Sequence, residues 1–216
     1  KWIREQDPGK GFAWSAEPDK AAATEECYWR HRVLVGEVHD DNCSALQGAG
    51  HAGLFGTVSN VLDFAADKLR SAGPDALIRT PLSGRRTHGW ERPYEGWSGG
   101  EHCSPQTIGH TGFTGTGLWI DFDRGHAWTL LTNRVHPTRH FDSGIFALRR
   151  AVFVTEDGAV RPDLADRTWE ALLTGPEVDV SDPLDEADWG QLWEMGLGYA
   201  IRPEQITESG SPPGLI

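Results

Sequence analysis

A glycine-rich stretch in the middle of the chain has the residue types of a catalytic rim. It reads Gly-His-Thr-Gly-Phe-Thr-Gly-Thr over residues 109–116 and leads directly into an apolar segment. Because glycine has no Cβ, Gly112 and Gly115 would let a ligand approach the backbone closely. Main-chain N–H groups in such a rim can hold the oxyanion that forms when an acyl carbonyl is attacked, and Thr111 offers a hydroxyl beside them. The alternative for these residue types is a glycine-rich turn into a β-hairpin, with no chemical role.

Several histidines have the chemistry of metal ligands, but their spacing argues against a metal site. They are His39, His51, His88, His102 and His110. Zinc sites usually show paired ligands at a short fixed spacing, such as His-Glu-x-x-His, and no such pair is present. We therefore expect no metal and no other cofactor. We expect His39 and His51 to order loops by hydrogen bonds, since polar groups in tight loops usually do.

The other reactive side chains give weaker signals. The cysteines are odd in number, are widely spaced and contain no Cys-x-x-Cys, which favours free thiols: Cys27, Cys43 and Cys103. Glu91 and Glu95 stand beside aromatic residues, but nothing in the sequence sets them opposite each other across a cleft, so a glycosidase pair is not expected. Trp90 could form the wall of an acyl pocket, although aromatic side chains of this kind pack in a core or at a rim more often.

The hydrophobic pattern predicts the sheet that must hold the rim in place. Residues 117–122 and 127–132 are strand-like and are joined by Asp-Arg-Gly at 123–125. This pattern predicts an antiparallel β-hairpin over residues 116–133, with the rim at its entry. Residues 79–108, rich in Gly, Pro, Arg and Trp, predict a long loop region.

Two helices are predicted near this hairpin. Apolar residues recur at three- and four-residue spacing through residues 58–71, which is typical of an amphipathic helix. Thr57 or Ser59 can cap its start, and Gly73 follows its end. A second helix is indicated by apolar residues at the same spacing: Ile145, Leu148 and Val152.

Composition and charge exclude several classes of function. Hydrophobic residues make up 38% of the chain and ten residues are tryptophan, which supports a packed core. The net charge is 20 − 32 = −12, and no Lys/Arg cluster is present, so we expect no nucleic-acid partner. No window of about 18 apolar residues could span a membrane. The N-terminal residues show no signal peptide, so we expect a soluble protein, in a compartment that the sequence does not determine.

Three segments together resemble the penicillin-recognising serine hydrolases. His110-Thr111-Gly112 resembles the family's third motif, usually Lys-Thr-Gly, in the His-Thr-Gly form of class C β-lactamase-like esterases and peptidases. Residues 36–57 resemble the family's "GxVHDxNA…AGHAGLFST" segment, which precedes a helix. Residues 131–138 resemble the segment that closes the strand after the third motif. The order and spacing of these segments also fit, and the resemblance covers roughly residues 25–152.

The resemblance implies acyl-transfer chemistry. In the family, a serine in Ser-x-x-Lys attacks an acyl carbonyl, the lysine and a tyrosine handle protons, and the acyl-enzyme is released to water or another acceptor. Two backbone N–H groups hold the oxyanion, and the resemblance assigns one of them to Phe113, the residue after the third-motif glycine. It also implies that His110 and Thr111 line the pocket and orient the substrate or a proton relay. Substrate binding is expected from the rest of the rim and one aromatic residue: Gly112, Thr114 and Trp90.

The residue at the first position of the third motif bears on the substrate. Histidine carries less positive charge than lysine at neutral pH. A carboxylate-bearing β-lactam would therefore be held less strongly at this wall. This favours an ester or amide substrate over penicillin.

The family's nucleophile is missing from this chain. The lysines are Lys1, Lys10, Lys20 and Lys68, and no serine stands three residues before any of them. None of the three tyrosines begins Tyr-x-Asn, and the only methionine is Met195. Both missing motifs lie upstream of the 36–57 segment in the family, so we expect further sequence before Lys1. We predict that the chain alone is inactive and that Ser-x-x-Lys comes from an upstream segment or a partner chain.

These features predict an α/β (α+β) fold: the C-terminal part of the β-lactamase/transpeptidase-like fold, with an antiparallel sheet flanked by helices. We expect a partial serine hydrolase domain over residues 1–154 and an acidic C-terminal extension over residues 155–216. The predicted function is a portion of a serine hydrolase that acts by acyl transfer on the ester, amide or peptide bond of a small molecule. The alternative is a non-catalytic remnant or binding module of the same fold.

Overall fold

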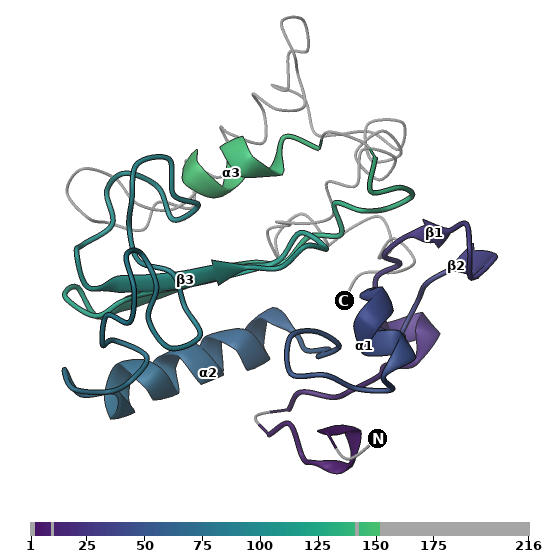
Figure 1. The fold of residues 1–216 in the computed structure, drawn as a ribbon, viewed down its shortest axis with the longest axis horizontal. Coiled ribbons are helices and arrows are strands. Elements are labelled where there is room, and N and C mark those ends of the chain that lie inside the picture. Colours follow the sequence, from purple (N-terminus) through teal and green to yellow (C-terminus); the bar gives the residue numbers. More distant parts are fainter. Residues whose placement is uncertain (1–2, 10, 141–142, 152–216) are drawn as a thin grey trace, which may run out of the picture.

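A three-stranded antiparallel sheet forms the centre of the computed structural model, which describes residues 3–9, 11–140 and 143–151 (Figure 1). The strands are β3 (Thr107–Thr111), β4 (Gly117–Asp121) and β5 (His126–Leu130), in that order across the sheet. Helix α2 (Val58–Ser71) packs on β4 and β5, and α3 (Ile145–Ala151) lies on the opposite side of the sheet (Figure 1). The predicted arrangement of an antiparallel sheet between helices is confirmed.

The N-terminal part of the described chain is built from short elements. Two 3₁₀ turns, Ile3–Glu5 and Pro18–Lys20, precede a two-stranded pair of β1 (Glu26–Cys27) and β2 (Arg32–Val33), and helix α1 (Asp41–Ala45) follows. The sequence did not predict these elements, because each is too short to show a periodic pattern. None of the helices in the described ranges is long and apolar enough to cross a membrane.

Helix α2 forms where its pattern predicts it. The Thr57 hydroxyl accepts a hydrogen bond from the Asn60 N–H, and the Asn60 side chain accepts one from the Thr57 N–H, so a capping box fixes its start. Ala65 is completely buried against Ile108 and Ile120 of the sheet. Val58 and Leu62, on the first half of the predicted apolar face, are 49% and 37% exposed.

The β4–β5 hairpin also forms as predicted. The rings of Trp119 and Trp128, which face each other across the two strands, stack with their centroids 6.1 Å apart. The Asp121 carboxylate is buried and accepts hydrogen bonds from the Ser104 hydroxyl at 2.6 Å and from the Arg124 N–H at 3.2 Å. Burial alone would raise the pKa of Asp121, but the hydrogen bonds outweigh it and lower the pKa. This carboxylate therefore holds both the hairpin turn and the segment before β3.

The predicted loop over residues 79–108 is wrong at its end, where strand β3 begins. The strand begins at Thr107, inside that region, and isolated bridges join Ser83 to Arg86, Arg86 to Glu91, and Glu91 to Gly109. The sequence did not indicate this strand, because Gly109 stands at its centre. A Cβ on Gly109 would come within 2.2 Å of the Trp119 ring on β4, so this position requires glycine although glycine disfavours strands.

The remaining predictions concern the C-terminal part. Helix α3 confirms the pattern at Ile145 and Leu148, which are both buried. Val152 and residues 155–216 lie outside the described residues, so the division into a domain over 1–154 and an extension stays a prediction.

Candidate active site

The outer edge of β3 is only partly covered. Gly109 exchanges two backbone hydrogen bonds with Glu91, at 2.8 and 3.0 Å, on the side away from β4. In an antiparallel ladder the backbone groups of alternate residues point to the same side, so those of Thr111 also point away from β4. Within the described ranges no further bridge forms on this edge beyond Gly109. The edge is therefore open where β3 ends.

A tight turn follows this open edge. The Gly115 N–H donates to the Gly112 carbonyl at 3.1 Å, which places Phe113 and Thr114 at the centre of a β-turn. Neither central residue has a positive φ, as in a type I turn. Phe113 is 57% exposed, and no acceptor for its N–H occurs among the residues that the structure describes. Among the described residues, the Phe113 N–H is thus a donor without an acceptor, at the end of the edge.

The glycines of the turn are required by the protein's own packing. A Cβ on Gly112 would come within 2.2 Å of the Thr116 hydroxyl, and one on Gly115 within 2.2 Å of the Thr132 hydroxyl. Gly115 also has a φ of +116°, which other residues rarely adopt. The sequence pattern predicts that these glycines allow close approach by a ligand. The structure gives a different reason, the close approach of neighbouring side chains.

His110 lies on the exposed part of β3 and contacts an arginine. Its Nδ1 is 2.9 Å from the Thr111 carbonyl oxygen, and its Nε2 is 3.2 Å from Nη1 of Arg86. Because a guanidinium can only donate, Nε2 must accept and Nδ1 must carry the proton. Arg86 also pairs with Glu91 at 3.1 Å. The structure therefore places the Arg86 cation beside His110. The sequence alone predicted a wall with less positive charge, because histidine stands where the family usually has lysine.

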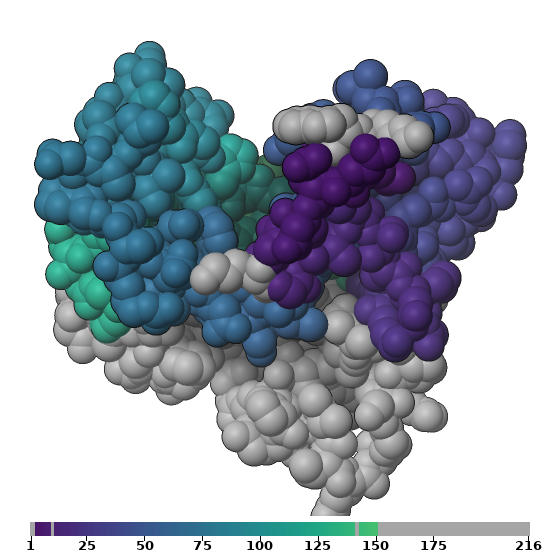
Figure 2. Space-filling model, turned by 90° about the horizontal axis from the view of Figure 1, so that it is seen from below, coloured from purple at the N-terminus to yellow at the C-terminus, as the bar shows by residue number. Residues whose placement is uncertain are grey.

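Phe113 contacts a different part of the chain. Its ring stacks on His39 with centroids 5.8 Å apart, and the Arg134 guanidinium lies 4.6 Å from the ring. Nε of Arg134 donates to the Phe113 carbonyl at 2.8 Å. The rim therefore runs from the loop of Arg86 to the segment of His39. Figure 2 shows an open notch between these two regions, the teal-blue loops on one side and the purple N-terminal part on the other.

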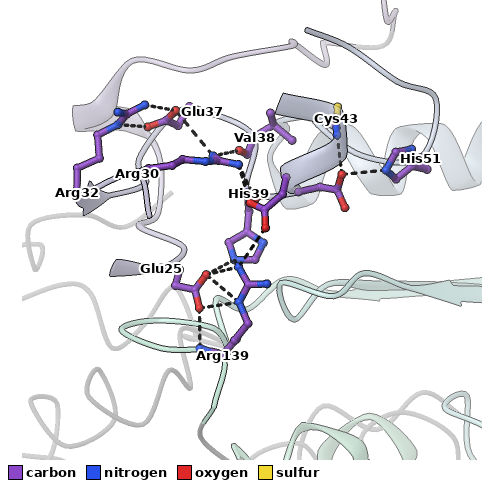
Figure 3. A network of polar contacts seen from close by, with 11 residues as sticks. Glu25, Arg30, Arg32, Glu37, Val38, His39, Cys43, His51 and Arg139 are labelled. Atoms are coloured by element: carbon purple, nitrogen blue, oxygen red, sulfur yellow. Dashed lines mark hydrogen bonds and ion pairs between the residues drawn. The ribbon is translucent and has the colours of Figure 1, made fainter. Parts of the chain in front are cut away.

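An ion pair between the buried Glu25 and the half-buried Arg139 fixes the segment that carries His39 (Figure 3). Glu25 accepts hydrogen bonds from Nε of Arg139 at 2.8 Å and from the Arg139 backbone N–H at 3.0 Å. Nε2 of His39 lies 2.9 Å from the same carboxylate. Burial alone would raise the pKa of Glu25, but the hydrogen bonds from Arg139 and His39 outweigh it and lower the pKa to about 2. This network joins residues that are far apart in sequence, and two of them, His39 and Arg139, lie against the Phe113 ring.

The two histidines of the family-like segment order loops, as predicted. His39 binds Glu25, and His51 lies 2.9 Å from the Asp40 carboxylate (Figure 3). Asp40 also accepts from the Cys43 N–H at 2.7 Å and so caps α1. Arg30 is buried and donates to the backbone oxygens of this segment, at Val38 and at His39.

Comparison with known proteins identifies the family. The family model described as Beta-lactamase matches residues 3–153, which is most of the chain. The chain belongs to the beta-lactamase family. The resemblance seen in the sequence motifs is confirmed, and with it the expected fold class. The described part of the chain is a hydrolase-family domain of mixed helices and antiparallel strands.

A curated relative supports this beta-lactamase-family assignment. The N-acetylmuramyl-L-alanine amidase of Bacillus subtilis (strain 168) is 34% identical over 128 residues, which cover 50% of this chain and 28% of the amidase. The chain thus spans little more than a quarter of the length of that relative. No solved structure matches the chain.

Two other features of this beta-lactamase-family chain lie apart from the rim. Trp90 stacks on Phe64 of α2, with centroids 6.4 Å apart, and packs against the core cluster, so the structure does not bring it to Phe113. A hollow of about 530 Å³ lies in the loops before β3 and is lined by no rim residue; its lining is Gly84, Arg85, Arg92, Pro93, Cys103 and Pro105. All three cysteines are free thiols, and the described residues contain no cluster of metal-binding side chains.

Proposed function

We propose that this chain supplies the oxyanion-binding rim of a serine hydrolase that cleaves an amide, ester or peptide bond of a small molecule. The nucleophile, in Ser-x-x-Lys, comes from an upstream segment or a partner chain. His110 and Thr111 line the pocket, and Gly112 and Thr114 shape the turn that faces the substrate. Among the bond classes we favour the amide, because the relative from Bacillus subtilis is named as an amidase.

The observation that carries this proposal is the N–H of Phe113, which has no acceptor within the described ranges. It lies at the end of a partly uncovered strand edge, on a half-exposed turn whose Phe113 ring contacts His39 and Arg134. An N–H without an internal acceptor can bind the oxygen of a carbonyl that is becoming an oxyanion. The resemblance of His110-Thr111-Gly112 to the family's third motif supports the same role for Phe113, the residue that follows the motif.

The reaction would run in two acyl transfers. The serine hydroxyl oxygen attacks the carbonyl carbon, its proton passes to a base on the missing segment, and the carbonyl oxygen becomes an oxyanion at the Phe113 N–H. The oxyanion collapses, the amine leaves with a proton, and an ester to the serine remains. Water then attacks that ester, releasing the carboxylic acid and restoring the serine. In both steps this chain donates a hydrogen bond and positions the substrate.

Reconstitution tests the proposal. The chain alone should release no burst of product from a chromogenic amide or ester. Combined with the polypeptide that carries Ser-x-x-Lys, it should release a burst equal in amount to that polypeptide, and the burst should vanish when the serine is replaced by alanine. A burst from the chain alone, or no burst from the combined polypeptides, would contradict the proposal.

A further inference from the structure

A buried arginine of helix α3 reaches the turn that carries Phe113. The Arg149 side chain is only 3% exposed, and its Nη2 donates to the Gly112 carbonyl at 3.0 Å and to the Thr116 carbonyl at 2.7 Å. No carboxylate of the described residues pairs with it. Burial, together with the charge of nearby Arg134, lowers the pKa of Arg149 to about 10, so the side chain stays cationic at neutral pH.

The hydrogen bond to Gly112 determines where the Phe113 N–H points. The Gly112 carbonyl and the Phe113 N–H belong to the same peptide unit. In a planar trans peptide these two groups point in opposite directions. Holding the carbonyl toward α3 therefore turns the N–H away from α3. The Gly115 N–H donates to the same oxygen at 3.1 Å, so the peptide plane is held by two donors.

We infer that Arg149 is a positioning residue, which orients and polarises the Gly112–Phe113 peptide so that its N–H can hold the oxyanion. This inference rests on the proposed function. A cationic donor on the carbonyl draws electron density from the peptide, and this makes the N–H of the same unit a stronger donor. Arg149 thus acts on the reacting oxygen through Phe113, without touching it.

Attachment of α3 alone does not explain this arginine. Ile145 and Leu148 of the same helix are 1% and 0% exposed and already attach the helix by apolar contact. Burying a charge without an opposite charge is unfavourable, and an apolar residue of similar volume is often at least as stabilising. Apolar packing does not explain why a cation stands at this position, where it donates to the carbonyls of Gly112 and Thr116 on the two sides of the turn.

The first test is the Arg149→Met variant in the hydrolase assembled with its Ser-x-x-Lys segment. We expect kcat to fall about 10- to 100-fold, since one misplaced donor costs up to that much, while KM changes little. Two controls lie on the same helix. Arg150→Met removes an exposed arginine, and Ile145→Val loosens the helix without touching the turn. Both should keep kcat at a temperature where the protein is folded.

A double-mutant cycle separates positioning from stability. Arg149→Met should cost nothing further in a Phe113→Pro background, because the N–H that it orients is gone. An equal loss in both backgrounds, or a loss no larger than that of Ile145→Val, would overturn the inference. If Arg149→Met does not fold, Arg149→Lys takes its place in the cycle, with an expected loss of about 10-fold, because lysine lacks the planar fork.

The same variants distinguish this inference from the function on which it rests. If Phe113→Pro and Phe113→Ala have equal kcat, the oxyanion role of Phe113 fails, and the role of Arg149 fails with it. If Phe113→Pro is much slower than Phe113→Ala but Arg149→Met is not impaired, the function stands and only the inference about Arg149 fails.

Discussion

Replacing Phe113 by proline is expected to lower kcat of the assembled hydrolase about 100- to 1,000-fold, the usual cost of removing one oxyanion donor. Proline has no backbone N–H. It also fits the fold, because Phe113 occupies the first central position of a β-turn with no positive φ, where proline is favoured, and its N–H has no acceptor among the described residues. The measurement is the rate of acyl-enzyme formation.

Phe113→Ala is the matched control for this substitution. It removes the same ring, with its contacts to His39 and Arg134, but keeps the N–H. Its kcat should stay within about 10-fold of that of the unaltered enzyme. The lost ring affects only how the substrate is positioned, while the N–H that stabilises the oxyanion charge is kept. Equal losses for alanine and proline would show that the ring matters and the N–H does not.

Replacing Glu25 by glutamine is expected to lower the free energy of unfolding by about 3 kcal/mol, at the low end of the cost of breaking a buried ion pair, because Arg139 is 29% exposed. Glu25 is 5% exposed and accepts hydrogen bonds from both Arg139 and His39. Glutamine removes the negative charge of residue 25, so the Arg139 cation loses its ion-pair partner. Denaturant unfolding at neutral pH measures the effect, and Glu26→Gln, at the exposed neighbouring residue, is the control.

The same pair predicts a pH dependence. The pKa of Glu25 is lowered from 4.5 to about 2 in the folded protein, so between these values the unfolded chain binds more protons than the folded one. The stabilisation by Glu25 is therefore complete above about pH 5 and is lost as the pH falls toward 2, a change of about 3 kcal/mol. The stability of Glu25→Gln should fall less steeply over this range. Parallel curves for the two proteins would contradict the role of the ion pair.

The fold was predictable where its pattern is local. The strand-like segments 117–122 and 127–132, joined by Asp-Arg-Gly, predicted the hairpin, and the capped helix at 58–71 had both its period and its start signal in the sequence. Strand β3 was not predictable in this way, because its interior glycine makes room for Trp119 on the neighbouring strand. Only a tertiary contact explains why glycine stands there.

The site was predictable only as a motif. The His-Thr-Gly stretch pointed to the rim, but the side chains that surround it are distant in sequence. Arg86 and His110 are 24 residues apart, Arg149 and Gly112 are 37 apart, and Glu25 and Arg139 are 114 apart. Such pairs leave no periodic signal, since their spacing depends on the lengths of the loops between them. They became visible only when the folded chain brought them together.

The most direct measurement of the central claim is a crystal structure of the assembled hydrolase with a boronic acid bound to the serine. The tetrahedral boronate has the geometry of the oxyanion intermediate. We predict that one of its oxygens lies about 3 Å from the Phe113 nitrogen, with the Gly112 carbonyl still turned toward Arg149. A boronate whose oxygens are held entirely by other groups, with the Phe113 N–H turned to solvent, would contradict the account.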